Sequence, residues 1–166
     1  MGAILRSAFF FGADGIAITG HSAPLSAVAL KAAAGAAELL PLMTIRDPFT
    51  FLDKSKAHGW HVYAADSSVG VKSGGPKSVM SSQLVSPLQR HPCILMMGSE
   101  GKGIRDRILQ RADTRLRIVG QRVGQGGVDS LNVSVAAGVL IEAFLRRPST
   151  LNQKQTKGPE SEGKIF

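Results

Sequence analysis

Apolar positions along the chain switch repeatedly between helix-like and strand-like spacing. Ile4, Leu5, Ala8 and Phe9 recur at intervals of three and four residues, which predicts a helix that Gly12 ends in a left-handed cap. Short apolar runs predict buried strands at 15–19, 42–45, 61–65, 93–97 and 116–119, and helices are expected between them at 25–37, 48–58 and 104–111. Strands that alternate with helices predict an α/β fold with a mostly parallel sheet flanked by helices.

Two helix starts carry recognisable signals. Asp47 and Pro48 are typical of an N-cap followed by the first helical residue. The last predicted helix, 132–146, is apolar nearly all round, which indicates burial on more than one side. Ser130 is the expected cap of this helix. Asn132 at its mouth must find hydrogen-bond partners, which a ligand or a neighbouring subunit could supply.

The remaining segments are polar and lack periodicity. Residues 66–91 are rich in Ser, Gly and Lys and are expected to form a mostly irregular surface insertion with at most one short helix. Residues 148–166 are expected to be a disordered polar tail. The chain is therefore expected to hold one domain, residues 1–147, followed by that tail.

Charge and cysteine content limit the classes of partner and metal site that the chain could have. Lys and Arg number 20 against 12 Asp and Glu, a net charge of +8 that favours a polyanionic partner. A basic protein that its charge merely keeps soluble is the alternative. The single cysteine, Cys93, lies in an apolar run, so a disulfide framework and a cysteine-based zinc site are both excluded, and no metal is expected. No apolar stretch reaches the ~18 residues of a membrane span.

Three short segments carry candidate chemistry. They are Gly2-x-x-x-Arg6 on the opening helix, Gly98-Ser-Glu-Gly-Lys-Gly103 after an apolar strand, and Ser130-Leu-Asn-Val-Ser134 before the last helix. The glycines of the second segment do not follow the G-x-G-x-x-G order of a dinucleotide site, and the next strand holds no acid for a ribose. The segment also lacks the Gly-Lys-Ser/Thr ending of a P-loop. Nicotinamide and ATP binding are therefore both disfavoured.

Taken together and in this order, the three segments resemble the SpoU–TrmH branch of the SPOUT methyltransferases. That family shows N-x-G-x-x-x-R, then G-x-E-x-x-G after a strand, then S-L-N-V-S-x-A before its final helix, and the resemblance covers residues 1 to about 147. The loop at 118–130, rich in Gly and Gln, looks most like the mitochondrial large-subunit rRNA branch, which methylates a guanosine ribose. Relatives that act on tRNA share the same catalytic residues, so a tRNA substrate stays open.

The resemblance implies a deep trefoil knot near the C-terminus, an exception to the un-knotted rule. It implies S-adenosylmethionine bound by the loops that carry Gly98, Ile118 and Leu131, and a homodimer built on the last helix. Arg6 would be the catalytic residue beside the ribose 2'-hydroxyl. The residues expected to orient Arg6 and the substrate nucleotide are Glu100, Ser130 and Asn132.

An RNA surface is expected around the cofactor loops. Cations there would contact phosphates, which position RNA without reading its sequence. The candidates are Lys102, Arg105, Arg107, Arg111, Arg115, Arg117 and Arg122.

The chain also departs from the family pattern. The motif's Asn would lie two residues before Gly2, and a strand is expected before that Asn, so the chain is expected to be a truncated or shortened form. A catalytically impaired RNA-binding module of the same fold is the competing hypothesis, and an α/β oxidoreductase is a third that the glycine order disfavours. Mitochondrial localisation is expected, with the cytoplasm as the alternative.

Overall fold

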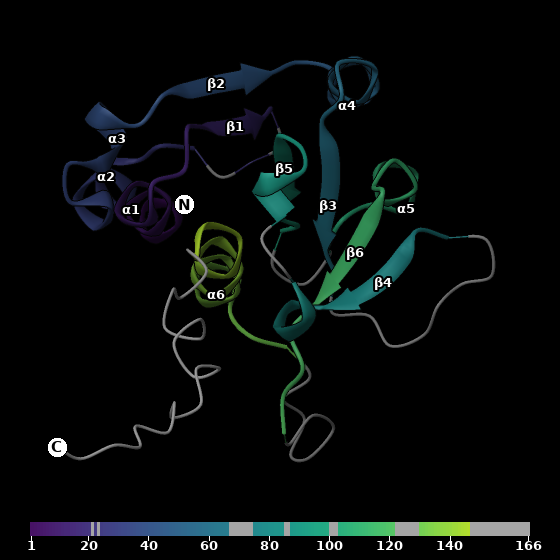
Figure 1. The fold of residues 1–166 in the computed structure, drawn as a ribbon. Helices are drawn as coiled ribbons and strands as arrows, with labels where there is room; N and C mark the ends of the chain where they lie inside the picture. The colour runs from purple at the N-terminus through teal and green to yellow at the C-terminus, as the bar shows by residue number, and fades with distance from the viewer. Residues whose placement is uncertain are drawn as a thin grey trace, which may run out of the picture.

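The computed structural model describes residues 1–20, 22, 24–66, 75–84, 87–99, 103–121 and 130–146. Helices and strands alternate along this part of the chain (Figure 1). The strands are β1 (Ile16–Thr19), β2 (Leu42–Ile45), β3 (His61–Ala65), β4 (Lys77–Met80), β5 (Cys93–Met96) and β6 (Thr114–Arg117). The helices are α1 (Gly2–Phe11), α2 (Ala27–Ala33), α3 (Ala36–Leu39), α4 (Pro48–Ala57), α5 (Asp106–Leu109) and α6 (Val133–Leu145), with 3-10 turns at Ser81–Gln83 and Pro87–Gln89.

All described strand pairs are parallel. Four strands form one sheet in the order β4-β6-β3-β5, and β1 and β2 form a separate pair. In the larger sheet His61 of β3 pairs with Cys93 of β5, and Tyr63 pairs with Thr114 of β6. The predicted α/β fold with a mostly parallel sheet is confirmed.

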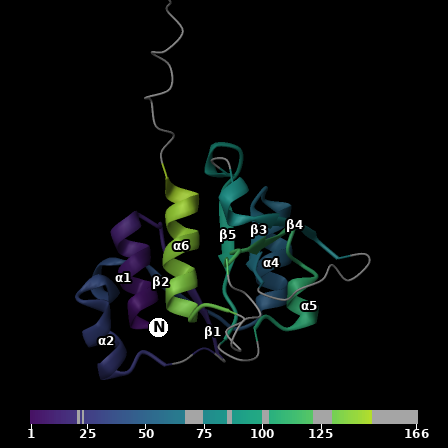
Figure 2. The ribbon, with the colours of Figure 1, turned by 90° about the horizontal axis from the view of Figure 1, so that it is seen from below.

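Helices cover both faces of the four-stranded sheet. Figure 2 shows α6 between the sheet on one side and α1 and α2 on the other, while α4 and α5 lie across the sheet. Tyr63 and Leu116 pack with Leu140 and Phe144 of α6. The opposite face packs on α4 and α5 through a second cluster: Leu52, Val62, Ala64, Leu109 and Ala112.

Helix α6 is buried from two directions, as its apolar pattern predicts. Ile141 of α6 packs against the cluster around Leu5 of α1, while Leu140 and Phe144 face the sheet. The second apolar face is thus covered within the same chain. Val135 and Val139 are the exception, with exposed fractions of 52% and 42%.

The local stop and start signals behave as predicted. Gly12 ends α1 with φ +90°, a left-handed conformation that glycine adopts without strain. The carboxylate of Asp47 accepts a hydrogen bond from the Phe49 N–H and so caps α4. The predicted helix at 25–37 is split into α2 and α3 because Ala34 and Gly35 both adopt positive φ.

The expectation of an irregular 66–91 segment is wrong for residues 77–80, which form β4. This strand pairs with β6 along its whole length and lies at the edge of the sheet. Val79 packs against the core cluster of Tyr63 and Leu116, whereas Lys77 and Met80 are exposed. An edge strand needs few apolar side chains, which explains why composition hid it.

The predicted knot and the polar tail involve 122–129 and 147–166, which lie outside the described residues. Both therefore stay predictions, as does the domain boundary at 147. Among the described helices, none is long and apolar enough to cross a membrane.

Candidate functional site

The candidate site lies at the carboxyl edge of the four-stranded sheet. β5 and β6 lie on opposite sides of β3, so the chain order reverses at β3. In open parallel sheets ligands bind at such a switch point, outside the carboxyl ends of the strands. Gly98 follows β5 and Ile118 follows β6, which places them at this edge, two strand spacings or about 10 Å apart.

The segment before α6 carries Leu131, the third residue expected at the site. Met97 and Ile118 both pack against the cluster that holds Leu140 and Phe144 of α6, so this helix joins the two loops. Leu131 lies just before α6 and is 49% exposed, and Val119 is 58% exposed. The exposed apolar side chain of Val119 beside the carboxyl end of β6 suits a flat heteroaromatic ligand.

Among the described residues, some backbone groups at this edge have no hydrogen-bond partner. Within the described residues, no hydrogen bond of the loops uses the backbone N–H or C=O of Gly98, Ile118 or Leu131. Main-chain groups could therefore form hydrogen bonds with a ligand ring. These groups keep fixed positions because they adjoin the strands. The structure thus places Gly98 and Ile118, two of the three residues that the resemblance implied for cofactor binding, at the same edge of the sheet, and the third, Leu131, precedes the helix packed on that sheet.

Gly98 is required by the shape of its own loop. A Cβ atom there would lie 2.6 Å from the Ile104 nitrogen and 2.7 Å from the Gly103 Cα, which is closer than real Cβ contacts allow. The loop closes because the Gly103 N–H donates to the Ser99 carbonyl at 2.9 Å. Glycine is therefore needed at 98 for the close approach of the loop backbone. A larger residue there would distort the loop and would affect ligand binding through that distortion.

Asn132, not Ser130, caps α6, so the predicted cap is wrong. The Asn132 side-chain oxygen accepts hydrogen bonds from the Ser134 N–H at 2.9 Å and from the Ser134 hydroxyl at 2.6 Å. Asparagine is among the best N-cap residues. The amide therefore has partners within its own helix, and the role of Ser134 could have been inferred from the Asn-x-Ser spacing. Ser130 is exposed beside the same helix end.

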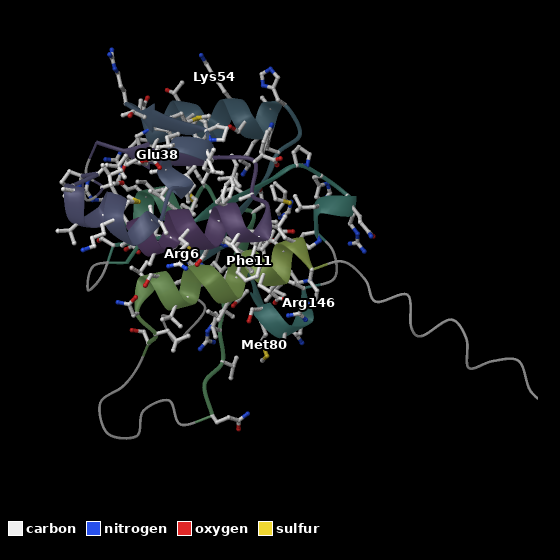
Figure 3. The ribbon with its side chains drawn as sticks, turned by 90° about the vertical axis from the view of Figure 1, so that its left-hand side faces the viewer. Arg6, Phe11, Glu38, Lys54, Met80 and Arg146 are labelled. Carbon is white, nitrogen blue, oxygen red and sulfur yellow. The ribbon has the colours of Figure 1, made fainter. Side chains whose placement is uncertain are left out.

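Arg6 extends from α1 on the side of the molecule where α1 and α6 lie next to each other (Figure 3). It is exposed, and within the described residues it makes no hydrogen bond or ion pair. The structure therefore does not join Arg6 to Ser130 or Asn132 by a direct bond. Glu100, the other residue expected to orient Arg6, lies outside the described residues.

The cations expected to contact RNA separate into two groups. Arg115 is only 7% exposed and lies 3.7 Å from the Asp66 carboxylate, so it is not a surface residue. Arg111 pairs with Asp53 and stacks on Phe49 at 4.6 Å. Because these two arginines have structural partners, the expectation that they contact RNA is wrong. The exposed or half-buried candidates are Arg105, Arg107 and Arg117, while Lys102 and Arg122 lie outside the described residues.

Polar residues at the opposite, amino edge of the sheet have structural partners. Asp113 accepts from the Val62 N–H at 2.9 Å and pairs with Lys56 at 2.7 Å. Burial opposes ionisation of Asp113, but the hydrogen bonds from Lys56 and Val62 outweigh it and lower its pKa. His61 bonds the Thr114 hydroxyl at 3.0 Å, and burial lowers the pKa of its ring. Among the described residues no cluster of three metal-ligating side chains exists.

Comparison with known proteins assigns the class. The SpoU rRNA Methylase family matches residues 1–142, so the chain belongs to that family. A curated relative from Schizosaccharomyces pombe, "rRNA methyltransferase 1, mitochondrial", is 40% identical over 87% of this chain and 46% of its own length. The "23S rRNA (guanosine-2'-O-)-methyltransferase" of Pseudomonas aeruginosa is 34% identical over 91% of this chain and 55% of its own length.

Solved structures agree with the fold. The S-adenosylmethionine-bound rRNA methyltransferase from Sinorhizobium meliloti superimposes with a TM-score of 0.70 and 27% sequence identity, and it covers 87% of this chain and 50% of its own. The chain spans about half the length of the relatives that it matches. The family resemblance drawn from the three motifs is confirmed.

Proposed function

We propose that this chain is the catalytic domain of an S-adenosylmethionine-dependent RNA methyltransferase that acts on a ribose 2'-hydroxyl. The observation that supports the proposal is the position of Gly98 and Ile118 at the switch point of a parallel sheet, in a fold similar to that of the S. meliloti enzyme. That enzyme's structure holds S-adenosylmethionine. The guanosine-methylating and mitochondrial names of the relatives support a guanosine in mitochondrial large-subunit rRNA as the target.

The residues at the site fit this cofactor. An adenine ring needs an apolar surface and main-chain donors and acceptors, and the exposed Leu131 side chain with the loop backbones at Gly98 and Ile118 offers both. When bound, S-adenosylmethionine would supply a methyl group on a positively charged sulfur. No metal takes part in the proposal.

Arg6 would supply the electrostatic part of catalysis. The ribose oxygen would gain the methyl group as the methyl–sulfur bond breaks with its electron pair left on sulfur, and the hydroxyl proton would pass to solvent water. Negative charge would therefore develop on that oxygen. A guanidinium stays protonated, and its planar fork can stabilise both the developing alkoxide and a neighbouring phosphate. Arg6 is exposed and has no partner among the described residues, so it is available for this role. Glu100, Ser130 and Asn132 would orient Arg6 and the nucleotide.

A homodimer is part of the proposal. Helix α1 covers one apolar face of α6, which removes part of the reason for expecting a dimer. Apolar side chains still remain exposed on both helices: Phe10 at 80%, Val135 at 52% and Val139 at 42%. A second copy of the chain packed on this face would cover them. Sedimentation should give a dimer at micromolar concentration, and a stable monomer would contradict this part of the proposal.

Arg6→Ala tests the catalytic assignment. It should lower methyl transfer by at least ~10²-fold, the scale on which lost transition-state stabilisation appears, and leave S-adenosylmethionine affinity nearly intact. Arg6→Lys should restore little, because a point charge lacks the planar fork. The exposed Lys31→Ala is a matched control away from the site and should keep full activity. Near-normal transfer by Arg6→Ala would remove the central residue of the mechanism.

Calorimetric titration separates this function from the RNA-binding module. The enzyme requires saturable binding of S-adenosylmethionine, whereas a module without activity binds RNA alone. Ribose methylation mapped on rRNA and tRNA from cells that lack the protein would identify the target. Loss of a tRNA methyl group with rRNA unchanged would favour the tRNA alternative.

A further inference from the structure

Helix α1 approaches α2 so closely at Gly2 that no other residue fits. A Cβ atom on Gly2 would lie 2.9 Å from the Ala29 carbonyl carbon and 2.9 Å from the Ala32 Cβ, and closer still to the Ala29 carbonyl oxygen. Two of these three atoms belong to the α2 backbone, which cannot turn aside as a side chain can. Gly2 is buried at this contact. The backbones of the two helices therefore meet here through a glycine.

The other contacts of α1 fix the rest of the helix. Leu5 is fully buried in a cluster with Ala33, Ala36 and Leu40. On the side of α6, a Cβ placed on Gly138 would lie 3.6 Å from the Ser7 hydroxyl, which is an ordinary contact. The packing of α1 is thus tight against α2 at Gly2 and relaxed against α6 at Gly138.

Arg6 follows Gly2 by one helical turn and leaves α1 from nearly the same side, about 40° further round the axis. Any retreat of α1 from α2 at Gly2 therefore moves the Arg6 backbone by a similar amount. To accept a Cβ, the start of α1 must retreat on the order of 1 Å, and a displacement of that size can cost a reacting group ~10²-fold in rate.

We infer that Gly2 is a positioning residue for the reaction, because its backbone contact with Ala29 sets the place of Arg6 relative to the substrate ribose. The inference rests on the proposed function of Arg6. Gly2 itself is buried against α2 and would act without touching the ribose. It acts by holding α1 at the distance from α2 that only a glycine allows.

A double-mutant cycle with the full chain tests this inference. Gly2→Ala should lower turnover by 10-fold to ~10²-fold with S-adenosylmethionine affinity unchanged. In an Arg6→Ala background the same change should lower turnover by less than about threefold further, because no guanidinium is left to displace. Gly138→Ala is the matched control: it also places a methyl group at a glycine contact of α1, and it should leave turnover unchanged.

A loss of turnover that persists in full in the Arg6→Ala background would overturn the inference, and so would normal turnover in folded Gly2→Ala. If Gly2→Ala does not fold, Gly2→Ala combined with Ala32→Gly relieves the side-chain part of the clash and leaves the Ala29 backbone part. That variant should fold and still show reduced turnover, and the reduction should disappear when it is measured in the Arg6→Ala background. Normal turnover would again overturn the inference. If Arg6→Ala alone keeps its activity, the proposed function fails instead, so the two failures are distinguishable.

Discussion

Asn132 has an observed role as the cap of α6 and a proposed role at the site, and substitution can separate the two. Its side-chain oxygen accepts from the Ser134 N–H and the Ser134 hydroxyl, which caps α6, and the same residue is expected to orient the substrate nucleotide. Asn132→Ala removes both functions. Asn132→Ser keeps a side-chain oxygen able to cap the helix but removes the amide nitrogen.

The size of the capping effect follows from the geometry. Helix α6 has 13 residues, and its first N–H groups have no partner inside the helix. Loss of an N-cap lowers the free energy of unfolding by about 0.5–2 kcal/mol. Because Asn132 is exposed, water can replace part of the lost hydrogen bonding. Asn132→Ala should therefore lower the free energy of unfolding by about 1 kcal/mol, or the melting temperature by ~2–4 °C for a chain of this length.

Urea unfolding and methyl transfer, measured on the same preparations, check both functions. Asn132→Ser should retain the unfolding free energy to within about 0.5 kcal/mol and still lose most of its turnover. Equal loss of stability in the Ser and Ala variants would refute the capping argument. Full activity of a stable Asn132→Ser would show that the amide has no part in the site.

Three further predictions concern stability and reactivity away from the site. Asp113→Asn should destabilise the fold at pH 7, because the pKa of Asp113 is lower in the folded chain than its ordinary value near 4. The ionised carboxylate therefore contributes its full stabilisation above that ordinary value. This stabilisation is lost as the pH falls through the folded pKa. Urea titrations should thus show the difference between Asp113→Asn and the unchanged chain shrinking below pH ~4, and a constant difference would contradict the assignment. Burial raises the pKa of the Cys93 thiol to about 11, so at pH 8 a thiol reagent should modify it far more slowly in the folded chain than in urea; equal rates would contradict its burial. Gly12→Ala should lower the free energy of unfolding by about 1 kcal/mol because φ is +90° there, and an unchanged melting temperature would show that α1 ends differently.

Much of the candidate site could be predicted because its motifs are short and local. Gly98 and Ile118 each follow a strand that the apolar spacing predicts, and parallel strands bring such loops to one edge, whereas Leu131 lies just before the predicted last helix. The sequence predicts the wrong cap for α6 because Ser130 and Asn132 are both good caps two positions apart. Only the backbone conformation decides between them, and helix ends are the least certain part of any pattern.

Neighbouring residues alone predict most of the helices and strands in their order, the end of α1 at Gly12, the start of α4 at Asp47, and the three motifs that carry the family resemblance. These features depend on residues close together in the chain, so the spacing and the chemistry of those residues can be read from the sequence. The tertiary structure alone decided which distant segments meet. It placed β4 beside β6, covered α6 with α1, buried Arg115 next to Asp66 and brought Gly2 against the Ala29 backbone. Each of these depends on long-range packing, in which a surface is covered by whichever element fits it, and no local pattern encodes that choice.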